Sequence, residues 1–369
     1  MKLTLQIKLL PIEDQAKSLL TTIKEANAAC NEISATVWEK KVFNQFKLHY
    51  LIYHDLKKST RRSAQVVIRC ISKVVDAYKP DKKRKRFFKP LGAITYDPRI
   101  FSYKGMTVSI WSVDGRLKIP FVCHNEKLLP YIKGEADLIY KKGKFYLFQT
   151  VEVPEEDVKD VEEFIGVDFG INNIATLSDG TSFGSQKLNE VRDNYFKVRR
   201  SVQRKGTNGS RKLLKRLKGR EQRHATITNH TISKRIVEKA VSENKGVAIE
   251  DLTHIRERTT VRKTQRRRHN AWSFFQLRSF LEYKTCRAGV PLVVIDPRYT
   301  SQTCNVCKFL GDRKGKHFSC PNCGNIADAD VNAAKNIAQL GAICNPSRKD
   351  VSMLKPFVSH IPLKAVCFS

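Results

Sequence analysis

Acidic residues are scarce in this chain of 369 residues. There are 36 aspartates and glutamates against 68 lysines and arginines, which gives a formal net charge of +32 at pH 7. A surface with so little negative charge repels itself unless a polyanion covers it, so nucleic acid is the expected partner. A basic protein of the membrane surface is the alternative class.

Long apolar runs are also missing. No stretch could cross a bilayer, and no basic amphipathic stretch ends in a lipidation motif. The first eight residues alternate as a strand does, without the apolar segment and cleavage site of a signal peptide. Six of the ten cysteines have no ligand spacing, which fits a reducing cytoplasm. We therefore expect a cytoplasmic protein with no membrane partner.

The other four cysteines form two Cys-x-x-Cys turns. Cys304 and Cys307 are followed, after twelve residues, by Cys320 and Cys323. Each turn lets two sulfurs face one point, so the four thiolates predict a closed tetrahedral zinc site. A disulfide framework is the disfavoured alternative. A closed four-thiolate site stabilises a fold and leaves no open position for catalysis.

The first half of the chain predicts a β-barrel-like module with a helical insertion. Residues 1–10 alternate as one strand, and residues 11–79 carry apolar side chains at three- and four-residue steps. Residues 80–153 alternate again, with hairpin turns at 113–116 and 141–144. The acidic segment 154–157 is the predicted linker to the last domain.

Two apolar strands and one helix of the second half carry acidic residues. Asp168 ends a strand that begins at 164, Glu250 ends a strand that begins at 246, and Asp328 and Asp330 precede a helix over 331–337. Taken singly, each acid has a structural interpretation as a turn cap, a solvated strand end or a helix N-cap. Residues 187–243 predict two long helices, divided at 206–210, with Ile227, Ile232, Ile236 and Ala240 as their buried stripe.

The order of these elements is that of an RNase H-like fold. In that fold Asp168, Glu250 and Asp330 would converge at one edge of the sheet. Carboxylate oxygens are the ligands that Mg²⁺ prefers, and two ions about 3.5–4 Å apart could lie between the acids and a phosphate. One ion would activate water and the other would stabilise the leaving 3′ oxygen.

Basic side chains gather in places that predict contacts with phosphate groups. A solvated charge run is the alternative interpretation. Around the break at 206–210 only Glu221 is negative, which favours nucleic acid there. The candidate residues are Arg61, Arg62, Lys83, Arg84, Arg86, Arg199, Arg200, Arg204, Arg211, Lys212, Lys215, Arg216, Arg266 and Arg267.

Four motifs resemble those of the TnpB family, the compact RNA-guided nucleases of insertion sequences related to type V CRISPR effectors. They are Ile-Gly-Val-Asp-Phe-Gly-Ile at 165–171, Ile-Glu-Asp-Leu at 249–252, Asp-Pro-Arg-Tyr-Thr-Ser-Gln-Thr-Cys at 296–304, and Asp-Val-Asn-Ala-Ala-Lys-Asn-Ile at 330–337. The resemblance implies that Asp168, Glu250 and Asp330 are the RuvC acids. It departs from the family at Lys308, where glycine is common, and at Ala329, where arginine is common.

The expected architecture is α+β and multidomain. It has a wedge domain (1–10 and 80–153) with a helical recognition domain (11–79), and a RuvC nuclease domain (160–340) with a zinc-binding insertion for target nucleic acid (300–327). A disordered tail is expected over 341–369. The resemblance implies one structural Zn²⁺, two catalytic Mg²⁺ and a guide RNA.

The expected function is guided cutting of double-stranded DNA beside a short motif. We expect a monomer with one RNA in a prokaryotic cytoplasm, at the nucleoid when it is bound to its target. A nuclease-inactive RNA-guided DNA-binding protein is the alternative. A plain zinc-ribbon protein that binds nucleic acid is a third possibility, which leaves Asp168 and Glu250 unexplained.

Overall fold

The computed structural model describes the chain except for residues 59–62, 254, 256–259, 261–265 and 346–369. The chain forms two compact units, Met1–Pro154 and Glu155–Ser369, which divide within the acidic segment 154–157. Each unit combines helices with sheet, so the architecture is α+β. Among the described residues, no helix has both the length and the apolar content to span a bilayer.

The first unit is built on a nearly closed, seven-stranded antiparallel barrel sheet in the order β2-β6-β7-β1-β5-β4-β3. The first strand of the chain lies in the middle, because it pairs with both β7 and β5. The β6–β7 turn places Lys142 and Gly143 at φ 53° and 76°, as a tight hairpin turn requires. The strands are β1 (Lys2–Leu9), β2 (Ile94–Tyr96), β3 (Phe101–Lys104), β4 (Thr107–Ser112), β5 (Gly115–Cys123), β6 (Ile132–Lys141) and β7 (Lys144–Glu152).

Three helices are inserted between β1 and β2. They are α1 (Glu13–Lys40), α2 (Gln45–Lys58) and α3 (Ala64–Tyr78). Ser63 caps α3 by accepting a hydrogen bond from the Gln65 amide. The helices share one hydrophobic core with the sheet, which makes the unit a single packed body. Two short 3-10 helices, η1 (Pro98–Ile100) and η2 (Glu126–Tyr131), complete it.

The second unit contains a five-stranded sheet in the order β10-β9-β8-β11-β12. The neighbours β8, β9 and β10 are antiparallel, whereas β11 runs parallel to both β8 and β12. The carboxyl ends of β8, β11 and β12 therefore meet at one edge of the sheet. The strands are β8 (Phe164–Asp168), β9 (Asn173–Leu177), β10 (Ser182–Gly184), β11 (Gly246–Glu250) and β12 (Leu292–Ile295).

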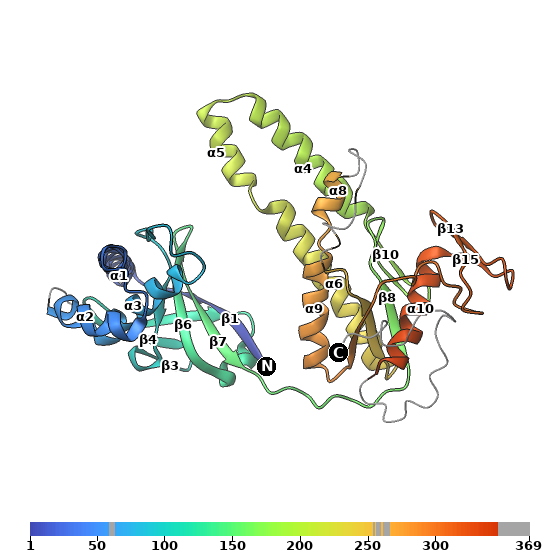
Figure 1. Ribbon diagram of the computed structural model, residues 1–369. Coiled ribbons are helices and arrows are strands. Elements are labelled where there is room, and N and C mark those ends of the chain that lie inside the picture. The colour runs from blue at the N-terminus through green and yellow to red at the C-terminus, as the bar shows by residue number, and fades with distance from the viewer. Residues whose placement is uncertain (59–62, 254, 256–259, 261–265, 346–369) are drawn as a thin grey trace. The chain divides into compact units, whose positions relative to one another are not determined.

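The last described helix, α10 (Ala329–Ile343), lies directly on this sheet (Figure 1). A Cβ atom on Gly166 of β8 would lie 1.9 Å from the carbonyl oxygen of Ala334, and one on Gly341 would lie 2.4 Å from the Cβ of Ala248. Glycine at both contacts lets the helix backbone approach the strands more closely than any side chain would allow. This approach fixes the position of the N-terminus of α10 over the end of β8.

The segment 187–243 holds three helices, so the prediction of two is wrong. They are α4 (Gln186–Arg204), α5 (Asn208–Leu217) and α6 (Arg220–Ser242). The additional break falls at Gly219, whose φ of 80° is left-handed and ends helical geometry at little cost for glycine. Ile227 is 64% exposed and does not belong to the buried stripe, whereas Ile232, Ile236 and Ala240 are buried.

Two further helices, α8 (Arg266–Ala271) and α9 (Phe274–Arg287), precede β12. A small antiparallel sheet follows it: β13 (Asp312–Lys314), β14 (His317–Ser319) and β15 (Ile326–Asp328). The strand β15 leads straight into α10. That helix includes residues 341–343, so the predicted disordered tail cannot begin at 341. The rest of that tail from 346 lies outside the described residues.

Candidate metal centre and nucleic-acid interface

Three acidic side chains meet where β8, β11 and α10 come together. Asp168 is the last residue of β8, and Glu250 is the last residue of the parallel neighbour β11. The register pairs Val167 with Ile249, so both acids reach the same edge of the sheet. Asp330 lies in the first turn of α10, close enough for its charge to act on Asp168.

Burial changes the protonation of the two strand carboxyls. Burial and the charge of Asp168 together raise the pKa of Glu250, which is 7% exposed, to about 8. Burial and the charge of Asp330 likewise raise the pKa of Asp168 to about 7. Water no longer stabilises the charged forms here, so a cation that neutralised them would bind favourably.

Three donors that the sequence did not indicate hold these acids. The Nη2 atom of Arg313 donates to Oδ1 of Asp330 at 3.1 Å, and Nδ2 of Asn173 donates to Oδ2 of the same carboxylate at 3.3 Å. The hydroxyl of Thr300 donates to Oε1 of Glu250 at 2.5 Å. Arg313 belongs to β13 and reaches the acids through tertiary packing, so no local motif marks it.

The two aspartates at the start of α10 have different surroundings. Asp328 is the N-cap, because its Oδ1 accepts from the amides of Asp330 at 2.9 Å and Val331 at 3.2 Å. The side chain of Asp330 is 14% exposed and contacts Arg313 and Asn173. The N-cap interpretation therefore describes Asp328, while Asp330 is the one that faces the other acids.

A cleft of about 640 Å³ opens beside Asp168 and Asp330. Its basic lining side chains come from β13 and the turn after it, and its aromatic side chains come from the residue after β8, from α8 and from the residue after α8. Such a lining can accommodate a phosphate group against the carboxylates, provided that a cation bridges the two. The lining includes Asp168, Asn173, His269, Trp272, Arg313, Lys316 and Asp330.

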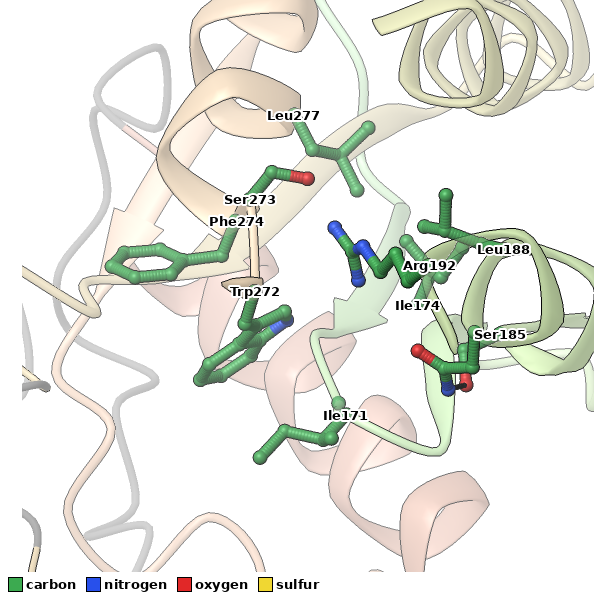
Figure 2. Close-up of a pocket in the computed structure, with 11 residues that line it drawn as sticks. Ile171, Ile174, Ser185, Leu188, Arg192, Trp272, Ser273, Phe274 and Leu277 are labelled. Atoms are coloured by element: carbon green, nitrogen blue, oxygen red, sulfur yellow. Dashed lines mark hydrogen bonds between the residues drawn. The ribbon is translucent and has the colours of Figure 1, made fainter. Parts of the chain in front are cut away.

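A smaller pocket adjoins this cleft, and the two share Gly170, Ile171 and Trp272 as lining residues. Figure 2 shows the guanidinium of Arg192 from α4 pointing toward Ser273 and Leu277. Arg192 is 9% exposed, burial lowers its pKa, and it forms an ion pair with Glu221 at 3.8 Å. A buried cation at this place connects α4 to the first turn of α6.

The four cysteines of the two turns converge. Their ligand atoms all lie within 4.8 Å of one another, with Sγ–Sγ distances of 3.7 Å for Cys304–Cys323 and 3.5 Å for Cys307–Cys320. Zinc–sulfur bonds of about 2.3 Å in a tetrahedron place sulfurs about 3.8 Å apart, so the cluster has the size of a zinc site. Among the described residues, no other group of His, Cys, Asp or Glu converges as closely.

The backbone of the first knuckle explains one departure from the family pattern. Lys308 has a φ of 65°, in the left-handed region that glycine adopts without strain. Its ammonium group donates to the carbonyl of Asn305 at 2.7 Å and to the side chain of Gln339 on α10. These two contacts offset part of the strain of a non-glycine residue at this position.

Comparison with known proteins assigns the chain to a family. A model described as "Cas12f1-like, TNB domain" matches residues 274–337, and one described as "Probable transposase" matches residues 148–269. The "TnpB-like protein MJ0751" of Methanocaldococcus jannaschii is 31% identical over 231 residues, which cover 58% of this chain and 82% of that protein. The chain belongs to the TnpB family.

Other relatives of this TnpB family member are larger. The "CRISPR-associated endodeoxyribonuclease Cas12f1" of Sulfoacidibacillus thermotolerans is 32% identical over 54% of this chain and 50% of its own length. A solved Cas12f1–sgRNA–target DNA complex matches in fold with a TM-score of 0.61 at 15% identity, over 89% of this chain and 83% of that one. The chain thus spans about half the length of the Cas12f1 sequence relative.

The basic residues predicted to contact nucleic acid differ in their surroundings in this TnpB family protein. Arg86 and Arg267 are held by acidic neighbours, Asp81 and Asp193. Arg61 and Arg62 lie outside the described residues. The remaining candidates are exposed: Lys83, Arg84, Arg199, Arg200, Arg204, Arg211, Lys212, Lys215, Arg216 and Arg266.

Proposed function

We propose that this protein is an RNA-guided, magnesium-dependent endonuclease that cuts double-stranded DNA. The observation that carries the proposal is the clustering of Asp168, Glu250 and Asp330 at one edge of the sheet, beside an open cleft that Asp168 and Asp330 line, with raised pKa values for the two strand acids. Carboxylates kept out of water in this way are typical of catalytic metal sites.

The strand order supports an RNase H-like assignment for the second unit. An antiparallel group, β10-β9-β8, continues into the parallel strands β11 and β12. Two of the acids end the neighbouring strands β8 and β11, and the third begins the helix that packs on them. The assignment to a RuvC-type nuclease rests on this arrangement together with the family membership.

Each residue of the site has a proposed role. Asp168, Glu250 and Asp330 would hold two magnesium ions through hard oxygen ligands. Bound magnesium would supply an activated water and would stabilise the leaving 3′ oxygen. Arg313 and Lys316, which line the same cleft, offer positive charge to the phosphate. Asn173 keeps the carboxylate of Asp330 oriented through its hydrogen bond.

The nucleic-acid partners follow from the charge of the molecule. A net charge of +32 favours a bound RNA that accompanies the protein and a DNA duplex as its target. We assign the barrel and its helices to wedge and recognition roles, and the zinc cluster to the loop that holds target nucleic acid. The proposed target carries a short adjacent motif, and the proposed location is the prokaryotic cytoplasm.

Amide substitution of the three acids tests the proposal. Asp168→Asn, Glu250→Gln and Asp330→Asn keep the shape of each side chain and remove the charge that holds magnesium. We expect each to abolish cleavage of a matched duplex while guided binding persists, because binding depends on base pairing and basic surfaces. Cleavage assays and binding measurements on the same complexes separate the two effects.

Asp328→Asn is the matched control. It lies two residues from Asp330 and caps α10, so we expect it to cut DNA at close to the wild-type rate. Cleavage by Asp168→Asn at the wild-type rate would overturn the assignment of the site. A wild-type protein that binds guided DNA without cutting it would instead identify the nuclease-inactive alternative.

A further inference from the structure

The loop between β12 and the first zinc knuckle carries the hydroxyl that reaches Glu250. It leaves the sheet at Asp296, whose carboxylate accepts from the amide of Arg298 at 2.9 Å. Tyr299 then takes a left-handed φ of 63°, and the amide of Thr303 donates to its carbonyl at 2.9 Å. This tight turn points the side chain of Thr300 back toward the end of β11.

Thr300 is 2% exposed and is held at several points. Its hydroxyl lies 2.5 Å from Oε1 of Glu250 and 2.9 Å from the carbonyl oxygen of Pro297. A hydrogen bond to a buried carboxylate is stronger than one between neutral groups, so it fixes the rotamer of Glu250 effectively. Glu250 therefore presents its second oxygen in one defined direction.

Two buried asparagines on α10 hold the loop itself. Nδ2 of Asn336 donates to the carbonyl oxygens of Thr300 at 2.9 Å and Thr303 at 2.6 Å. Asn332, one turn earlier, donates to Thr303 at 2.7 Å and accepts from the amide of Asn305 at 2.9 Å. Both side chains are completely buried. The helix that presents Asp330 is thereby joined to the segment that begins the zinc cage.

We propose that Thr300 is a positioning residue of the acidic metal site, and that Asn336 acts through it. The Thr300 hydroxyl orients Glu250, and Asn336 holds the loop so that the hydroxyl stays in place. Folding of the zinc loop onto α10 consequently sets the geometry of the divalent-metal site. This inference rests on the proposed function, since it concerns how that site binds its ions.

Manganese binding to the full-length, zinc-loaded protein, freed of nucleic acid at high salt, tests the inference without relying on cleavage. We expect Thr300→Val, which keeps the shape and loses the hydroxyl, to weaken Mn²⁺ binding about ten- to hundredfold, as loss of a ligand-orienting group does. Thr300→Ser restores the hydroxyl and should bind within a few-fold of wild type. Electron paramagnetic resonance of free Mn²⁺ gives the affinities.

A matched control lies three residues away. The side-chain hydroxyl of Thr303 is completely buried and makes no hydrogen bond in the structure, so Thr303→Val removes an equivalent group that does not touch Glu250. We expect it to bind Mn²⁺ as wild type does. Its backbone contacts to the asparagines remain.

The possible outcomes separate the inference from the function on which it rests. Wild-type Mn²⁺ affinity in Thr300→Val, with weak binding in Glu250→Gln, would overturn the role of Thr300 alone. Unchanged binding in Glu250→Gln would overturn the proposed metal site. Zinc content and thermal unfolding identify variants that fail to fold, and Thr300→Ala, with the same expected loss, then replaces Thr300→Val. The magnesium concentration for half-maximal cleavage should shift in the same direction.

Discussion

Glu250 shows at the scale of one residue how burial opposes charge. The carboxyl ends an apolar strand whose residues are all buried, beside a second acid and beneath a helix that carries a third. Keeping it ionised there is unfavourable, and the hydrogen bond from Thr300 compensates only in part. The site is therefore poised to release protons when a divalent cation binds.

The stability of the metal-free protein should depend on pH through Glu250 and Asp168. In the unfolded chain these carboxyls lose their protons near pH 4, whereas in the folded protein their pKa values are about 8 and 7. Their contribution to the free energy of unfolding is therefore complete below pH 4 and is lost as the pH rises to 8. We expect Glu250→Gln to be more stable than wild type at pH 8. At pH 5 this advantage should be smaller.

Thermal unfolding from pH 5 to pH 8, with and without magnesium, checks this prediction. Added magnesium should stabilise wild type more at pH 8 than at pH 6, because fewer protons then compete for the carboxylates. The same addition should have little effect on Glu250→Gln. A constant difference between the two proteins across the pH range would contradict the raised pKa of Glu250.

At the scale of elements, the contact between α10 and the sheet decides where the third acid lies. Gly166 on β8 and Gly341 on α10 have no Cβ atom, so the helix and the strands can approach each other closely. The helix N-terminus then falls above the end of β8, and Asp330 faces Asp168. A side chain at either glycine would have to push the helix away from the strand.

Gly166→Ala should therefore damage both stability and cleavage. Its methyl group would meet the backbone of Ala334 and Ala338, which cannot move without shifting the whole helix. We expect a loss of about 1–3 kcal/mol in the free energy of unfolding and a large loss of cutting rate. Gly184→Ala on β10 is the control, because its added Cβ would meet open space. Equal stability of the two variants would contradict the close packing of α10.

The segment that carries Cys304, Cys307, Cys320 and Cys323 is the second element whose disruption should affect the acidic site. Cys320→Ser should release zinc and, through the loop held by Asn332 and Asn336, reduce cleavage. Metal analysis and unfolding measurements check this, with Cys123→Ser in the first unit as the control. A Cys320→Ser protein with full stability and full cleavage would show that the cluster is not a structural zinc site.

At the scale of the whole molecule, the excess of basic residues on exposed surfaces favours association with nucleic acid. Many lysines are already neutralised by neighbouring acids, whereas the helices α4 and α5 expose arginines and lysines with few acidic partners. Binding of nucleic acid releases counterions in proportion to the phosphates contacted. The slope of affinity against salt therefore reports how many of these side chains take part.

We expect the combined substitutions Arg200→Gln, Arg204→Gln, Arg211→Gln and Lys212→Gln to weaken RNA binding. The slope of log affinity against log salt should fall by roughly 3, at about 0.7–0.9 for each lost phosphate contact. A control removes four lysines that already pair with carboxylates and so loses the same formal charge. The control residues are Lys17, Lys79, Lys133 and Lys234. Equal slopes for both variants would exclude this surface as a specific contact.

Short-range patterns in the sequence determined the strand alternation, the hairpin turn at 141–144, the candidate acids and the four converging thiols. Each of these depends on neighbouring residues, whose geometry the backbone fixes within a few positions. Family membership, too, could be inferred from four short motifs. The second break in the helical segment 187–243 was not predicted, because a single glycine such as Gly219 is tolerated in many helices.

The sequence already favoured Asp330 over Asp328 as the third acid. The tertiary structure shows Asp328 as the N-cap and reveals Arg313, Asn173 and Thr300 beside the acids. These side chains come from different strands and loops, and they meet because α10 and the small sheet of β13, β14 and β15 pack at one edge of β8 and β11. Packing brings together residues far apart in the chain, and no local periodicity records such contacts. The same packing excludes water from Glu250 and so raises its pKa.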